Sequence, residues 1–172
     1  NRARIFFKFK TLVEQHSDEL ATLITQQHGK VFSDAKGELT RGLEVIEFAC
    51  GIPHLIKGEH SLNVGTDVDS HSLMQPVGVC AGITPFNFPA MVPMWMYPMA
   101  IACGNTFILK PSERDPSASM FAWKLFKEAG LPDGVLNVVP GYGATAGKAL
   151  SEHPDLQKLD LTGGTPTGVH NR

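Results

Sequence analysis

The chain has 172 residues and a mass of 18.6 kDa, with 42% hydrophobic and 19% charged residues, a balance that excludes whole-chain disorder. Its formal net charge is −2 and its lysines and arginines are scattered, which argues against a nucleic-acid partner. The most apolar run, Phe88 to Cys103, spans 16 residues and contains three prolines, so it is too short to cross a bilayer.

Residues 1–56 are predicted to be helical. Apolar residues recur at helical spacing over residues 3–28, and Ser17-Asp18-Glu19 interrupts them as a candidate N-cap for a second helix that ends at Gly29. A further helix is predicted over residues 33–49 and is closed or kinked at Gly51-Ile52-Pro53. Its predicted buried positions are Leu39, Leu43, Val45, Ile46 and Phe48.

Residues 57–76 are polar, contain glycine and lack strong helix formers. They predict a loop with one or two short strands, in the form of a hairpin arm that reaches out of the domain. Such an arm either pairs with another subunit or stays free, and the sequence favours neither.

Residues 77–172 alternate between strand and helix patterns. Strands are predicted over residues 77–83, 106–109, 135–139 and 158–161, and helices over 90–102, 117–129, 144–152 and from Pro166. This alternation is typical of right-handed βαβ units. The fold class is therefore α/β, a doubly wound, Rossmann-like parallel sheet preceded by an N-terminal helical arm.

Three polar clusters follow predicted strands, where an open parallel sheet binds its ligands. Asn87 is either a turn residue that bonds its own backbone or a ligand contact. Lys110 and Glu113 form either a surface ion pair or part of a binding site. The turn Thr162–Gly168 is either a plain strand-to-helix connection or a place where the backbone approaches a phosphate.

Cys50, Cys80 and Cys103 are odd in number and widely spaced, which predicts free thiols in a reducing, cytoplasmic compartment. The cysteines and histidines do not show metal-ligand spacing, so we expect no metal. The chain starts at Asn1 without methionine and already within a helical pattern, so we expect it to be part of a longer protein.

Two motifs carry a family resemblance. ITPFNFP (residues 83–89) followed by GNTFILKPSE (residues 104–113) resembles the NAD-dependent aldehyde dehydrogenase superfamily. RGLEVIEFACGIPHLIKGE (residues 41–59) adds to the resemblance, which is greatest to the methylmalonate-semialdehyde dehydrogenase branch. The resemblance implies an incomplete enzyme. Residues 1–56 would be the helices of its cofactor domain, 57–76 an oligomerisation segment, and 77–172 a truncated NAD-binding core.

The resemblance also implies roles for single residues. Asn87 would donate its side-chain N–H to the oxyanion formed when a thiolate attacks an aldehyde. Arg41 would bind the carboxylate end of the substrate. Lys110 and Glu113 would hold the adenosine ribose hydroxyls, which favours NAD over NADP. Gly164 stands where the superfamily usually has serine, so one contact to the pyrophosphate is missing. The full implied cofactor set is Ile83, Thr84, Pro85, Phe86, Lys110, Ser112, Glu113, Gly143, Gly163 and Gly164.

In the implied reaction a cysteine attacks the aldehyde, NAD accepts the hydride and coenzyme A accepts the acyl group. The superfamily's catalytic cysteine lies beyond the position of Arg172, so we expect this chain to be inactive alone and the complete enzyme to be a homo-oligomer, a dimer or tetramer. Residues 142–168 are more similar to general aldehyde dehydrogenases, which leaves open an enzyme that releases a free carboxylate. A further alternative is an inactive NAD-binding or assembly module.

Overall fold

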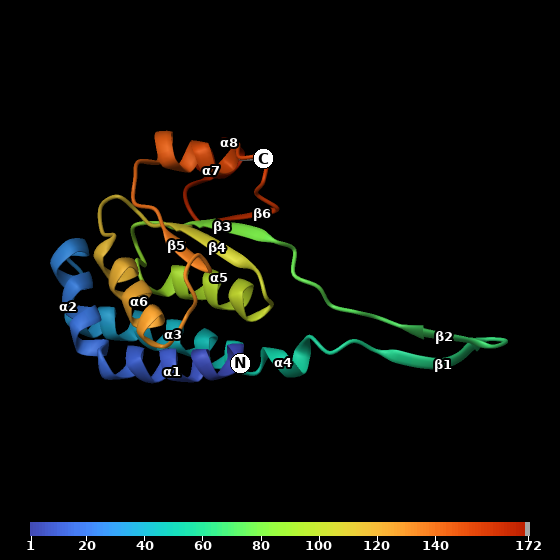
Figure 1. The fold of residues 1–172 in the computed structure, drawn as a ribbon. Helices are drawn as coiled ribbons and strands as arrows, with labels where there is room; N and C mark the ends of the chain where they lie inside the picture. Colours follow the sequence, from blue (N-terminus) through green and yellow to red (C-terminus); the bar gives the residue numbers. More distant parts are fainter. Residues whose placement is uncertain (171–172) are drawn as a thin grey trace.

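The computed structural model describes residues 1–170, in which a four-stranded sheet has helices on both faces and a long hairpin projects from one end (Figure 1). The helices are α1 (Arg2–Gln15), α2 (Ser17–His28), α3 (Phe32–Cys50), α4 (Ile52–Leu55), α5 (Met91–Ala102), α6 (Ser117–Glu128), α7 (Lys148–Ser151) and α8 (Thr165–His170), with a π-helical turn η1 (Gly143–Gly147) before α7. The strands are β1 (His60–Gly65), β2 (Val68–His71), β3 (Val79–Ile83), β4 (Thr106–Lys110), β5 (Leu136–Val138) and β6 (Lys158–Leu161).

The parallel sheet has the strand order β5-β4-β3-β6, which confirms the predicted fold class. From β3 the chain winds outward through β4 to β5, then crosses to the other side of β3 to form β6. Helices α5 and α6 lie with α1–α3 on one face, and α7 and α8 lie on the other (Figure 1). The point where the winding reverses lies between β3 and β6, and this is where open α/β sheets bind ligands.

The first two helices meet at His16, and the predicted Ser17 cap is wrong. Ser17 is already the first residue of α2, and its side chain makes no capping hydrogen bond. Its hydroxyl instead accepts a hydrogen bond from the Lys36 ammonium of α3 at 2.6 Å. A tertiary contact has therefore taken the group that could have capped the helix. Gly29 ends α2 in the left-handed conformation, with φ of 87°, as expected of a glycine at this position.

Helix α3 buries one stripe against α1 and α5. Its buried residues are Ala35, Glu38, Leu39, Gly42, Ile46, Ala49 and Cys50. Of the predicted core positions, Leu39 and Ile46 are buried, Leu43 and Val45 are half-buried, and Phe48 is exposed. Phe48 lies two residues from Ile46, which places it about 200° around the helix and away from the stripe. A methyl group at Gly42 would lie 2.6 Å from Met94 Sδ, so α3 and α5 cross there in close contact.

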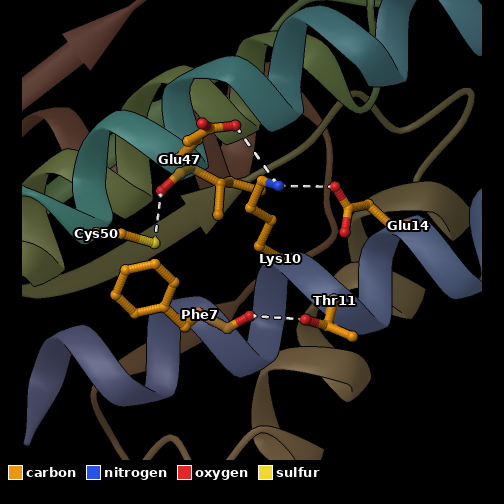
Figure 2. A network of polar contacts seen from close by, with 7 residues as sticks. Phe7, Lys10, Thr11, Glu14, Glu47 and Cys50 are labelled. Atoms are coloured by element: carbon orange, nitrogen blue, oxygen red, sulfur yellow. Dashed lines mark hydrogen bonds and ion pairs between the residues drawn. The ribbon is translucent and has the colours of Figure 1, made fainter.

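Helices α1 and α3 are also joined by a polar network, shown in Figure 2. The Lys10 ammonium lies 2.8 Å from Glu14 on its own helix and 3.5 Å from Glu47 on α3. One turn further along α3, the Cys50 thiol donates to the Ile46 carbonyl at 3.4 Å. This thiol is occupied within its own helix, and burial raises its pKa.

Below the sheet, aromatic rings fill the core between the N-terminal helices and the βαβ units. Phe9 stacks on Phe126 with ring centroids 4.1 Å apart, and Tyr97 packs at 6.0 Å from Phe126. Phe107 of β4 is also fully buried. The helices of residues 1–56 therefore belong to the same hydrophobic core as α5, α6 and the sheet.

Strands β1 and β2 form an antiparallel hairpin that extends away from this core (Figure 1). Every residue of both strands is exposed, including the apolar side chains of Leu62, Val64 and Val68. Within residues 1–170, no helix combines the length and apolar character needed to cross a membrane.

The predicted helix over residues 144–152 is split into η1 and α7. The sequence of η1, GATAG, begins and ends with glycine, and only Gly147 among its residues is buried. This turn takes the π form, which occurs often at functional sites.

Candidate functional site

Two loops face each other at the carboxyl edge of the sheet, at the reversal between β3 and β6. The loop after β3 contributes Pro85, Phe86 and Asn87, and the loop after β6 contributes Thr162, Gly163 and Gly164, to a cleft of about 370 Å³. A neighbouring hollow of about 500 Å³ lies on the α7–α8 side of the sheet. It is lined by Ile83, Gly143, Ala144, Gly147, Lys148, Pro166 and Thr167. Seven of the predicted site residues thus line these two adjoining hollows.

Asn87 is exposed and lines the cleft. Within residues 1–170 its side-chain amide makes no hydrogen bond, so it is not the self-bonded turn asparagine that the sequence also allowed. Its backbone, by contrast, is held in place, because the Lys30 ammonium donates to the Asn87 carbonyl at 2.8 Å. A fixed backbone with a free amide is the arrangement that a preorganised hydrogen-bond donor requires.

The loop that carries Asn87 is anchored at further points. The Phe86 ring stacks on His28 with centroids 4.5 Å apart, and the Ser119 hydroxyl donates to the Pro89 carbonyl at 3.0 Å. Burial, reinforced by the nearby Lys30 charge, lowers the pKa of His28, so the stacked ring is neutral near pH 7.

Sequence reasoning missed Lys30 and Glu38, which lie directly behind this loop. Glu38 is buried, pairs with Lys30 at 2.7 Å and accepts backbone hydrogen bonds from Ala90 and Met91. One signal was present in the sequence. Glu38 falls at helical spacing from Ala35, Leu39 and Gly42, so it is a carboxylate within an apolar stripe.

The predicted Lys110–Glu113 pair is present at the end of β4, with Lys110 buried and Glu113 exposed. The Lys110 side chain is 3% exposed, and its ammonium lies 3.2 Å from the Glu113 carboxylate, which is 41% exposed. A hydrogen bond from its own backbone and the Lys110 ammonium lower the pKa of Glu113. Ser112 is buried and its hydroxyl accepts from the Arg114 N–H. Glu113 is therefore the accessible member of the pair, and Lys110 lies buried beside it rather than facing a cleft.

Two buried polar side chains near these loops lack well-formed hydrogen bonds. Thr84, directly after β3, has a buried hydroxyl without a partner, although its N–H donates to the Lys110 carbonyl. Neither carboxylate oxygen of Asp115 makes a well-formed hydrogen bond. Burial raises the pKa of Asp115 to about 6, against the opposing effect of the nearby Ser112 hydroxyl. The unpartnered Thr84 hydroxyl, next to Pro85 of the glycine-lined cleft, fits a polar ligand there.

Arg41 is exposed and lines a different hollow, of about 420 Å³. That hollow also contains His28, Lys30, Ser33, Asp34, Gly37, Glu38 and Phe88. Phe88 is the neighbour of Asn87 in the chain, so the Arg41 hollow and the Asn87 cleft lie on either side of one short segment.

None of the three cysteines lines the Asn87 cleft. Cys80 is buried in the first half of β3, and burial raises its pKa, which makes its thiol a weak nucleophile. Cys50 is bonded within α3, and Cys103 follows α5 and is half-buried. Among residues 1–170, His, Cys, Asp and Glu side chains do not form a group of three that could hold a metal ion.

Known proteins match this chain over nearly its whole length. The model of the aldehyde dehydrogenase family matches residues 1–170. The acylating, mitochondrial methylmalonate-semialdehyde dehydrogenase of Arabidopsis thaliana is 50% identical over 98% of this chain and 28% of its own length. A methylmalonate-semialdehyde dehydrogenase structure from Oceanimonas doudoroffii is 56% identical, with a TM-score of 0.96 over 99% of this chain and 35% of that one.

A structure of the aldehyde dehydrogenase from Bacillus cereus in complex with NAD+ is 37% identical, with a TM-score of 0.94 over 99% of this chain and 35% of that one. The chain thus spans about a third of the length of the proteins it matches.

Proposed function

The chain belongs to the aldehyde dehydrogenase family, and from that premise we propose that it supplies the NAD site and the oxyanion donor of an enzyme that oxidises methylmalonate semialdehyde or a related semialdehyde. The observation that carries the proposal is the free Asn87 amide, which lines a cleft opposite a glycine turn at the reversal of a parallel sheet. The identity of about half of all positions to semialdehyde dehydrogenases supports the substrate class.

Asn87 stabilises the oxygen that becomes negatively charged when a thiolate attacks the aldehyde carbon. A side-chain N–H directed at that oxygen binds the tetrahedral species more tightly than the planar aldehyde, which lowers the barrier. Because Cys50, Cys80 and Cys103 do not line the cleft, the thiolate comes from a part of the enzyme outside this chain. The chain by itself is therefore inactive as a dehydrogenase.

NAD, when bound, accepts the hydride that leaves the substrate. The residues that hold it are Ile83, Thr84, Pro85 and Phe86 after β3, Ser112 and Glu113 after β4, Gly143 in η1, and Gly163 and Gly164 after β6. The buried Lys110 orients the Glu113 carboxylate. The ionised Glu113 accepts hydrogen bonds from ribose hydroxyls and repels a 2′-phosphate, which favours NAD over NADP. Gly163 and Gly164 lack side chains, so a phosphate can approach their backbone.

Arg41 binds the carboxylate at the far end of the substrate. Its guanidinium is exposed in a hollow that adjoins the Asn87 segment, and a planar fork suits a carboxylate well. A substrate with an aldehyde at one end and a carboxylate at the other would thus be held on both sides of the Asn87–Phe88 segment.

The acyl group then passes to coenzyme A, as the word acylating in the name of the Arabidopsis relative supports. Release of a free carboxylate is the competing outcome. The complete enzyme, assayed with the semialdehyde and NAD, should form NADH rapidly only when coenzyme A is added. Equal NADH formation without coenzyme A, with the free acid as product, would contradict acyl transfer.

The hairpin of β1 and β2 is the subunit contact of this enzyme, in the reducing environment of the cytoplasm. Exposed Leu62, Val64 and Val68 give it apolar surface that a second chain would cover. Replacement of Val64 by aspartate should shift the complete enzyme to smaller species in light scattering after size-exclusion chromatography. An unchanged mass of the variant would show that the hairpin is not part of the subunit interface.

The central test is calorimetric titration of NAD into the complete enzyme and its Glu113→Gln variant. We expect NAD to bind the wild type more tightly, because the neutral amide no longer attracts both hydroxyls and can itself donate. The affinity for NADP should rise relative to that for NAD in the variant. Unchanged affinity for both nucleotides would show that the cofactor does not contact Glu113 and would contradict the proposed site.

A further inference from the structure

A buried carboxylate caps the helix that follows the Asn87 loop. The Glu38 side chain has no exposed surface, and its Oε1 accepts the N–H groups of Ala90 at 2.8 Å and Met91 at 3.1 Å. These groups belong to the start of α5, where the helix offers backbone N–H donors no partner. The N-cap residue, Ala90, has no polar side chain to bind them, so the cap comes from a different helix.

The same carboxylate also binds Lys30, which contacts the two residues that precede Pro89, Asn87 and Phe88. The Lys30 ammonium lies 2.7 Å from Glu38 Oε2, 2.8 Å from the Asn87 carbonyl oxygen and 4.5 Å from the centroid of the Phe88 ring. The Lys30 side chain is almost fully buried, so removal of either partner leaves an uncompensated charge inside the protein.

Together the pair fixes the backbone of residues 87–91 at both ends. Its contacts reach the carbonyl of Asn87, the ring of Phe88 and the first N–H groups of α5, while the Asn87 amide itself stays free. The direction in which the Asn87 side chain leaves the backbone is thereby set before any substrate binds. Donors that are oriented in advance need no reorganisation during the reaction.

We infer that Lys30 and Glu38 are positioning residues for Asn87, an inference that rests on the oxyanion role proposed above. They do not touch the substrate. They act through the backbone of residues 87–91, so their loss should lower turnover and leave the affinity for NAD nearly unchanged.

The test is a double variant, Lys30→Met with Glu38→Gln, in the complete enzyme. Glutamine keeps an oxygen that accepts the N–H groups of Ala90 and Met91, and methionine fills the lysine's space without a charge. The helix cap therefore survives, while the Asn87 carbonyl and the Phe88 ring lose their cation. We expect kcat to fall about tenfold to a hundredfold, since small misplacements of a catalytic group have effects of this size. The KM for NAD should change less than about twofold.

Lys36→Met is the matched control. Lys36 lies on α3 and pairs with Asp18 at 2.7 Å, and its described contacts do not include residues 87–91. Its kcat should match that of the wild type. If the double variant fails to fold, Lys30→Arg keeps a positive charge beside Glu38 but changes the geometry at the Asn87 carbonyl, and it should lower kcat by a smaller factor.

A cycle with Asn87→Ala separates positioning from general damage. If the pair acts through Asn87, adding Lys30→Met and Glu38→Gln to Asn87→Ala should lower kcat no further. Two results would overturn the inference and leave the role of Asn87 intact. One is that the losses of kcat in the double variant and in Asn87→Ala are fully additive, and the other is that kcat is unchanged in the double variant and in the single variant that replaces it. Unchanged kcat in Asn87→Ala itself would instead overturn the oxyanion role.

Discussion

The two loops that face each other across the cleft are built in opposite ways. The loop after β3 lies between prolines and is held by Lys30, by Ser119 and by ring stacking on His28. In the turn after β6, the Thr162 N–H donates to the Ile83 carbonyl and the Gly168 N–H donates to the Gly164 carbonyl, and the glycines are exposed. Side-chain contacts from other helices thus hold one side of the cleft, whereas the other side is an exposed glycine turn.

This difference matches the two tasks that we propose. Stabilisation of a short-lived oxyanion depends on a donor whose direction does not change, whereas a phosphate chain can be followed by a backbone that adjusts around it. Single substitutions in the fixed loop and in the open turn test whether the two differ in this way.

Glu38→Ala should have the largest effect. It leaves the Lys30 ammonium without its counter-ion and the first N–H groups of α5 without their acceptor, and should lower the free energy of unfolding by about 3–5 kcal/mol. Chemical denaturation of the complete enzyme measures this. Glu47→Ala, which removes an exposed carboxylate from the same helix, should change stability by less than about 1 kcal/mol. Equal effects of the two variants would show that the buried pair does not hold the loop.

Asn87→Ala comes next, with an effect on turnover rather than stability. Loss of one oxyanion donor should lower kcat about a hundredfold to a thousandfold in the complete enzyme. The melting temperature should stay the same, because the amide is exposed and unpaired. Asn137→Ala, on the far strand β5, is the control and should keep full activity. A shared loss of activity and stability in Asn87→Ala would point to a structural role.

Asp115→Asn should stabilise the protein at neutral pH by roughly 1–3 kcal/mol. Burial raises the Asp115 pKa to about 6 in the folded state, so the folded protein binds this proton more tightly than the unfolded chain does. Stability from this group is therefore greatest below about pH 4 and is lost as pH rises through 6. Denaturation curves at pH 4 and pH 7 should show that the free energy of unfolding falls less in the variant than in the wild type. The same fall in both proteins would exclude Asp115 as the cause of the pH dependence.

Gly164→Ser should have the smallest effect and concerns the open turn. It adds the hydroxyl that the family usually has there, and a new hydrogen bond of about 0.5–1.5 kcal/mol would tighten NAD binding by about twofold to tenfold. A Cβ at Gly164 meets nothing closer than Pro166 Cδ at 3.7 Å, so the fold tolerates it. Gly168→Ser is the matched control in calorimetric titrations. Weaker NAD binding in Gly164→Ser alone would argue against a phosphate at this turn.

Local patterns were enough to predict the elements that make the sheet. The alternation of strand and helix patterns after Val77 predicted four parallel strands, because each pattern reflects burial within one short segment. The ends of the strands, with Asn87 and the Gly163–Gly164 turn, followed from the same pattern, since parallel strands place their carboxyl ends at one edge.

Contacts between distant segments were not predictable in the same way. Lys30 and Glu38 meet the Asn87 loop across more than fifty positions of the chain, and no local periodicity reports such a meeting. Lys110 was expected at the rim with Glu113, but the chain after β4 covers it. Ser17 was predicted to cap α2, but its hydroxyl accepts a hydrogen bond from the Lys36 ammonium of α3 instead.

The missing side chain at Gly42 has a consequence for the whole site. Helix α3 rests directly on Met94 of α5 at this point, with Arg41 and Glu38 on the turn before it. A Cβ at this position would lie 2.6 Å from Met94 Sδ and 3.1 Å from Met94 Cβ, so Met94 would have to move to make room for it. A larger residue at position 42 would therefore disturb the packing between α3, which carries Glu38, and α5, whose first N–H groups Glu38 binds.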